Sequence, residues 1–180
     1  MTTTTSAPAA TSGRPGYFDD YAHLAIERDD NGVLLVTMHD GAGGPITFSA
    51  QDHTEFTEAF YRIGRDMGNK IVILTGSTDY MAAIDFATFL NSSDPEAGLR
   101  VFDEGVQILE NLLNIHVTVI AAVEGQALLH TEYALSANIV SAGECAAVGD
   151  LPHFAGGIVP GDGVCSAWAL RAGHARAEAW

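Results

Sequence analysis

Residues 70–75 read Lys-Ile-Val-Ile-Leu-Thr, a short run that is apolar at its centre. Such a run is typical of a strand that is buried on both faces in a layered α/β fold. A second run of the same kind extends from Val117 to Val123 and is stopped by Gly125. Segments with helical periodicity lie between and after these two runs. The alternation predicts a βαβ-type core of the α/β class.

The segment before the first buried run predicts a hairpin and a helix. In residues 23–39, two strand-like runs flank an Asn31-Gly32 turn. Ser49, followed by Asp52 three residues later, is typical of the start of a helix. The apolar face predicted for this helix consists of Phe56, Phe60 and Ile63. His53 lies in the first turn of this helix and is expected to be exposed.

Further elements are expected in the rest of the chain. They are a short helix at 81–86, a long helix from Pro95, a helix at 128–135, strands at 138–142 and 146–148, and a helix from Val164 with a break at Gly173. One stripe of the long helix is apolar and is expected to face the core. Its members are Leu99, Phe102, Val106, Leu109 and Leu113.

Composition excludes several functional classes. The 180 residues suit one domain, and the net charge of −15, with one lysine and seven arginines, argues against binding to nucleic acid or anionic membrane. No apolar run is long enough for a membrane span. Residues 1–16 lack the pattern of a secretion signal, so we expect a disordered leader, a core domain over residues 17–180 and a cytoplasmic protein.

The cysteines and the known short motifs limit the chemistry further. Cys145 and Cys165 are too few for a disulfide framework and are expected to be buried free thiols. The sequence has no glycine motif for phosphate, no metal-ligand spacing and no Gly-x-Ser-x-Gly elbow. We therefore expect no metal and no cofactor.

The segment from Asp150 to Gly163, Asp-Leu-Pro-His-Phe-Ala-Gly-Gly-Ile-Val-Pro-Gly-Asp-Gly, places an imidazole and a carboxylate nine residues apart. If the chain folds back on itself here, Asp162 would orient His153, and His153 would activate a water. The alternative is a glycine-rich surface turn with a solvated histidine and aspartate.

A second histidine, His130, follows the predicted strand at 117–123, just as His153 follows the strand at 146–148. The ends of parallel strands collect functional sites, and two imidazoles there suit acid/base chemistry near neutral pH. His130 could equally be a core or cap histidine. Glu132 could pair with His130 or face solvent.

Four segments resemble, in order, motifs of the crotonase (enoyl-CoA hydratase/isomerase) superfamily. Residues 70–76 match the strand before the first oxyanion loop, and residues 81–85 match the F-x-A-G-x-D loop. Residues 119–125 match the P-V-I-A-A-V-N-G segment, and residues 156–163 match the G-x-x-P-G-x-G-G turn. The resemblance implies a crotonase-like ββα-repeat spiral core whose C-terminal helical region is truncated. It also implies a homo-oligomer, either a trimer or a hexamer, if assembly does not require the C-terminal region.

Where the sequence differs from the hydratase pattern, it is similar to the sequences of β-diketone hydrolases of the 6-oxocamphor hydrolase type. Glu132 falls approximately at the first catalytic glutamate of hydratases, but His153 stands at the second. The resemblance implies a His153–Asp162 dyad, His130 as a second active-site histidine and an oxyanion-binding N–H near Ala82. Phe48 falls at the position of a tryptophan of the substrate pocket.

The expected function is therefore hydrolysis of a C–C bond in a cyclic or bicyclic β-diketone by a retro-Claisen mechanism, with a small-molecule diketone as the partner. Two alternatives stay open. One is an acyl-CoA hydratase or isomerase that uses Glu132 and His153 as its acid/base pair. The other is a non-catalytic protein with the crotonase fold.

Overall fold

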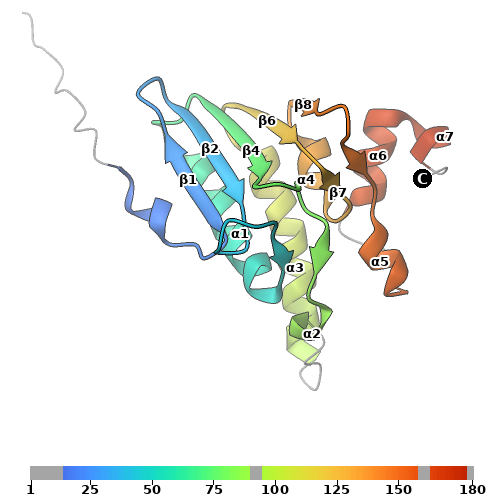
Figure 1. Ribbon diagram of the computed structural model, residues 1–180. Helices are drawn as coiled ribbons and strands as arrows, with labels where there is room; N and C mark the ends of the chain where they lie inside the picture. Colours follow the sequence, from blue (N-terminus) through green and yellow to red (C-terminus); the bar gives the residue numbers. More distant parts are fainter. Residues whose placement is uncertain (1–13, 90–94, 158–162, 178–180) are drawn as a thin grey trace, which may run out of the picture.

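The computed structural model describes residues 14–89, 95–157 and 163–177 (Figure 1). Its main sheet has five strands in the order β1-β2-β4-β6-β8. These are β1 (Leu24–Arg28), β2 (Val33–Met38), β4 (Ile71–Gly76), β6 (Thr118–Val123) and β8 (Ile139–Ala142). The β1–β2 pair is the predicted antiparallel hairpin, and the other neighbours are parallel.

A repeat follows four of these strands: each leads into a short strand and then a helix. The short strands are β3 (Thr47–Phe48), β5 (Ala83–Ile84), β7 (Gln126–Ala127) and β9 (Ala147–Val148). They form a second layer in which β3 pairs with β5 and β7 with β9, and a bridge from Met81 to Ala127 joins the two pairs. This arrangement confirms the predicted α/β class with a ββα-repeat core.

A helix or a pair of helices follows the short strand of each repeat. They are α1 (Ala50–Arg65), α2 (Phe86–Phe89), α3 (Pro95–Leu113), α4 (Thr131–Ser136) and α5 (Leu151–Ala155), preceded by the 3₁₀ helix η1 (Gly16–Asp19) and followed by α6 (Val164–Ala172) and α7 (His174–Ala177). In Figure 1, α1, α3 and α4 lie behind the sheet. The predicted Phe56, Phe60 and Ile63 face of α1 is buried there.

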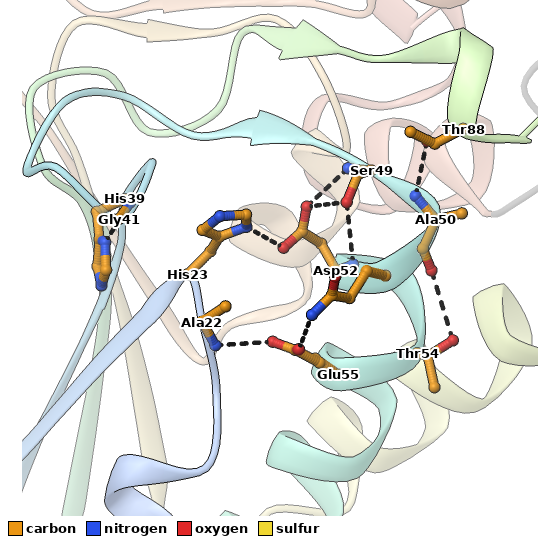
Figure 2. Close-up of polar contacts among 11 residues, drawn as sticks. Ala22, His23, His39, Gly41, Ser49, Ala50, Asp52, Thr54, Glu55 and Thr88 are labelled. Carbon is orange, nitrogen blue, oxygen red and sulfur yellow. Dashed lines mark hydrogen bonds and ion pairs between the residues drawn. The ribbon is translucent and has the colours of Figure 1, made fainter.

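The first turn of α1 is fixed by the predicted cap. Ser49 is the N-cap residue, and a capping box joins it to Asp52. The same carboxylate is held from the other side by His23, which precedes β1, with 2.6 Å between Nδ1 and Oδ1. Figure 2 shows these three side chains meeting at the start of α1. The position of this turn therefore depends on both its own cap and the neighbouring strand.

The apolar stripe expected on the long helix is a wrong prediction for four of its five members. Leu99, Phe102, Val106 and Leu113 are exposed, and only Leu109 packs against the core. The buried side chains of α3 are instead Ile108 and Leu112. The physical reason is that α3 packs against α1 and α4, and those two helices select a different side of its surface.

Three local predictions also need correction. Residues 83–84 form β5 rather than a helix, because they pair with β3, and a helix begins only at Phe86. The helix expected from residue 128 begins at Thr131, because the N–H groups of Leu128 and Leu129 both donate to the Met81 carbonyl. Both cysteines are exposed instead of buried.

Two remaining expectations concern the start of the chain and membranes. Residues 1–13 of the expected leader lie outside the described residues, whereas Arg14 binds Asp19 at 2.7 Å and η1 begins at Gly16. Within the described part of the chain, no helix has the length and apolar character needed to cross a bilayer.

Candidate active site

Four of the predicted site residues come from the short-strand layer, one from each repeat. Phe48 ends β3 and Ala82 immediately precedes β5, while His130 and His153 follow β7 and β9. This layer continues from the carboxyl ends of the parallel strands (Figure 1), where α/β folds place their sites. The repeat therefore brings together residues that are up to about a hundred positions apart in sequence.

His130 is held in an unusual backbone conformation. Its φ and ψ are 46° and 42°, and among the described residues it is the one non-glycine residue with positive φ. The left-handed region costs a non-glycine residue about 1–3 kcal/mol, and such strain is concentrated at functional sites. The conformation lets the chain turn from the Met81 contact directly into α4.

Side chains on three sides fix the orientation of the buried His130 ring. Its Nδ1 lies 2.7 Å from Oε1 of the buried Glu132, so of the two alternatives for this carboxylate, pairing is correct. The ring stacks on Tyr133, with centroids 5.1 Å apart and planes 4° apart. The edge-on ring of Phe48 lies 4.8 Å away. A ring held in this way can present its other nitrogen in one direction only.

His153 lies on α5 and is also bound through Nδ1. The two oxygens of Asp150 lie 2.8 and 2.9 Å from this nitrogen, and both side chains are almost fully buried. A carboxylate only accepts hydrogen bonds, so the proton of this contact belongs to Nδ1 and the lone pair to Nε2. No hydrogen bond to Nε2 is found within residues 14–89, 95–157 and 163–177. This nitrogen is therefore suited to accept a proton.

The two imidazoles lie edge to face. The ring centroids of His130 and His153 are 5.4 Å apart, and the ring planes meet at 77°. Phe86, at the start of α2, contacts His153 edge-on from 6.4 Å. Two histidines, each backed by a carboxylate and enclosed by aromatic rings, form an arrangement suited to proton transfer on an uncharged substrate.

Two predicted site residues have less defined places. Ala82 is half-buried beside β5. The carbonyl of the preceding residue, Met81, accepts hydrogen bonds from the N–H groups of Leu128 and Leu129, just before His130. Asp162 lies outside the described residues, so its pairing with His153 stays a prediction. In the described part of the chain, Asp150 is the carboxylate on this ring.

A third histidine, His53, joins the cluster, and the expectation that it is exposed is wrong. It is buried, its Nδ1 lies 3.3 Å from Oε2 of Glu104 on α3, and its ring is 6.2 Å from that of His130. The signal was present in the sequence, because His53 extends the buried Phe56–Phe60 stripe by one helical turn. Glu104 also borders a groove of about 840 Å³ between α1 and α3.

Asp150 is a further candidate site residue, which sequence reasoning missed. It caps a short helix with Pro152 in its first turn, a pattern that would have placed Asp150 and His153 on neighbouring turns. The glycines and prolines of the segment instead favour a turn when the sequence is considered alone.

The charge of the Glu132 carboxylate also affects the pKa of Tyr80. Burial, followed by the nearby Glu132 carboxylate, raises the pKa of the Tyr80 phenol well above its usual value. Within the described residues, no hydrogen-bond partner is found for the Tyr80 hydroxyl. The described histidines, cysteines and acids form no group of three or more that could hold a metal ion.

Comparison with known proteins yields one family and several related structures. The family model of enoyl-CoA hydratase/isomerase matches residues 28–180. The structure is similar to that of a β-diketone hydrolase from the cyanobacterium Anabaena sp. PCC 7120 bound to (S)-3-oxocyclohexyl acetic acid. The sequence identity is 46%, the TM-score is 0.88, and the match covers 92% of this chain and 66% of that chain. No curated protein sequence matches.

Two more distant structures share the fold alone. An enoyl-CoA hydratase/isomerase from Mycobacterium paratuberculosis is 22% identical, with a TM-score of 0.80 over 90% of this chain and 65% of that one. DspI of Pseudomonas aeruginosa is 23% identical, with a TM-score of 0.75 over 94% of this chain and 62% of that one. The chain thus spans slightly less than two thirds of the length of each of these three proteins.

Proposed function

The chain belongs to the enoyl-CoA hydratase/isomerase family, and on that premise we propose that it hydrolyses a C–C bond between the two carbonyls of a cyclic or bicyclic β-diketone. The observation that carries the proposal is the edge-to-face pair of imidazoles, 5.4 Å apart, each with Nδ1 on a carboxylate. The 46% identity to a β-diketone hydrolase supports the same substrate class.

His153 is the general base of the proposed reaction. Asp150 accepts the Nδ1–H, so the lone pair on Nε2 can remove a proton from water while the water oxygen attacks one carbonyl carbon. Asp162, assigned this orienting role from the sequence, stays part of the proposal as a second carboxylate of His153.

His130 stabilises the negative charge that forms on the attacked carbonyl oxygen. While Nδ1 is bound to Glu132, a proton on Nε2 can be donated to the oxyanion. The backbone N–H of Ala82 is the second proposed donor. Phe48 closes the site beside His130 and gives an apolar surface for the ring of the substrate.

The bond-breaking step balances without a cofactor. When the tetrahedral intermediate collapses, the C–C bond breaks and its electron pair becomes an enolate that is delocalised onto the second carbonyl. The proton that His153 took from water returns to the enolate carbon, and the attacked carbonyl becomes a carboxylic acid. One diketone and one water give one keto acid.

The charge of the site favours a small neutral substrate over acyl-CoA. The carboxylates nearest the imidazoles are Glu104, Glu132 and Asp150, and the chain has a net charge of −15. A ligand with several phosphates would be repelled by this balance.

The test is incubation of the purified protein with a panel of bicyclic β-diketones, with release of acid as the measurement. We expect release from at least one compound. His116→Ala is the control for substitutions of the site histidines, because His116 is exposed and its recorded side-chain hydrogen bond goes to the Gly64 carbonyl. No release from any diketone, together with protection from heat unfolding by an acyl-CoA, would favour the hydratase/isomerase alternative.

Assembly is a separate part of the proposal. We expect the protein to form the homo-oligomer, a trimer or a hexamer, that its family resemblance implies. Sedimentation equilibrium measures this directly, and a monomer at micromolar concentration would contradict it.

A further inference from the structure

A further histidine–carboxylate pair lies at the first turn of α1, close to the start of β1. Nδ1 of His23 is 2.6 Å from Oδ1 of Asp52, and Figure 2 shows this ring directed at the first turn of α1. His23 is partly exposed, whereas the Asp52 side chain is fully buried. The pair thus connects the surface with the interior.

The buried Asp52 carboxylate depends on very few donors. Oδ2 accepts hydrogen bonds from the backbone N–H and the hydroxyl of Ser49, at 2.7 and 2.6 Å. In the part of the chain that the structure describes, the donor recorded for Oδ1 is His23. A buried charge that loses a donor is costly, and the surrounding backbone must move to compensate.

The residues of this pair are next to two rings of the candidate site. Ser49 directly follows Phe48, and Asp52 directly precedes His53. The ring of Phe48 lies 4.8 Å from that of His130, and the ring of His53 lies 6.2 Å from it. A shift of the turn that contains Ser49 and Asp52 would therefore move both rings relative to His130.

We propose that His23 is a positioning residue of the active site: by binding Asp52 it fixes the place of Phe48 and His53, and so sets how tightly substrate is held. The inference rests on the proposed function for its kinetic test. Among the described residues, no ring pair is recorded between His23 and the rings of the site. We therefore expect His23 to affect substrate binding and to leave the proton transfer at His153 unchanged.

Other contacts at the same place support a defined position for His23. The preceding backbone N–H, that of Ala22, donates to Oε2 of Glu55 at 3.0 Å, one turn further along α1. The loop after β2 approaches the ring at Gly41. The charged or titratable side chains around this ring are those of Asp52 and Glu55 on α1, and of His39 and Asp40 in that loop.

The kinetic test compares His23→Ala with His23→Asn. The amide of asparagine can donate from nearly the position of Nδ1. We expect His23→Ala to raise the KM for the cleaved diketone about fivefold or more, because misplaced binding groups weaken substrate binding. The value of kcat should stay within about twofold, and His23→Asn should restore KM. An equal loss of kcat in both variants would overturn the proposal.

His39→Ala is the matched control, because its ring nitrogen accepts only the Gly41 N–H of its own loop among the described residues. It should leave KM unchanged. If His23→Ala does not fold, His23→Gln replaces it, because its amide lies one carbon further from the backbone and should also raise KM.

A spectroscopic test separates this inference from the proposed function. The NMR signals of the Phe48 and His53 rings should shift in His23→Ala and return in His23→Asn. Unchanged ring signals would overturn the positioning role whether or not the wild-type protein cleaves a diketone. Absence of cleavage by the wild type would instead count against the proposed function.

Discussion

His130 and His153 are each bound through Nδ1 to a carboxylate within three residues, yet the chain holds the two rings differently. His130 sits in a left-handed backbone conformation, stacked on Tyr133 and in contact with Phe48. His153 sits on a five-residue helix, with Phe86 and His130 as its recorded ring neighbours.

The difference indicates two roles for one kind of pair. The His130 ring is fixed on several sides, and its backbone is strained. Such a ring suits a hydrogen-bond donor that must already be in place when negative charge develops on the substrate oxygen. A ring fixed mainly at one nitrogen suits a base that gains and loses a proton in each turnover. The predictions below test whether the two histidines are interchangeable, as their similar carboxylate contacts would suggest, or distinct.

The largest effect is expected from His153→Ala. Without the general base, kcat/KM for the best diketone should fall by roughly 10²-fold or more. The measurement is the rate of acid release, with His116→Ala as the control. A loss of less than about threefold would mean that another group removes the proton from water.

The next effect is expected from His130→Asn. Asparagine tolerates the left-handed region, so this variant removes the imidazole without adding backbone strain. We expect kcat to fall about 10²-fold with KM little changed, as when an oxyanion donor is lost. A variant that raises KM alone would place His130 in substrate binding instead.

A smaller effect is expected from Asp150→Asn. The amide can donate to Nδ1 and so stabilise the tautomer that lacks the lone pair on Nε2, which should lower kcat about tenfold or more. Asp162→Asn is the matched variant. A larger loss in Asp162→Asn than in Asp150→Asn would assign the orienting role to Asp162, as the sequence predicts.

The sequence predicted the framework of the molecule well, because that framework depends on local patterns. The buried runs at 70–75 and 117–123, the Asn31-Gly32 turn and the Ser49–Asp52 cap each specify their element without help from distant residues. The stripe on α3 was assigned to the wrong side, because helical periodicity shows that a face is apolar but not which neighbour it meets.

For the candidate site, the sequence identified the imidazoles better than their partners. His130 and His153 could be found from strand ends, and Glu132 from its place beside His130. Asp150 and the buried state of His53 depend on how α5 folds and on Glu104 reaching across from α3. The contact of His53 with Glu104 joins two repeats, and the spacing of these two residues in the sequence does not indicate it. The contact of His153 with Asp150 lies within α5 and follows once that short helix is recognised.

The smallest effect is expected from Asp66, which belongs to neither of the two histidine–carboxylate pairs of the candidate site. Burial acts to raise the pKa of Asp66, but the Gly68 N–H, Arg28 and Tyr17 together hold that pKa below its usual value. Since the folded pKa is lower than the unfolded one, this carboxylate stabilises the fold above the unfolded value of about 3.9 and loses that effect as pH falls through the folded value.

Asp66→Asn should therefore lower the free energy of unfolding by up to about 1 kcal/mol at pH 7, since the pair is partly screened by solvent. The difference from the wild type should shrink as pH falls below the unfolded pKa of about 3.9, and acid release from the diketone should not change. Urea unfolding at several pH values measures the first effect. A destabilisation that persists undiminished at low pH would contradict this view of Asp66.

Cleavage in ¹⁸O-labelled water tests most directly whether this chain uses His153 to add water across a C–C bond. We predict that, in a single turnover, the wild-type protein places one labelled oxygen in the new carboxyl group of the keto acid. His153→Ala should give almost no labelled acid in the same time. An unlabelled acid, or equal labelling by both proteins, would contradict the account.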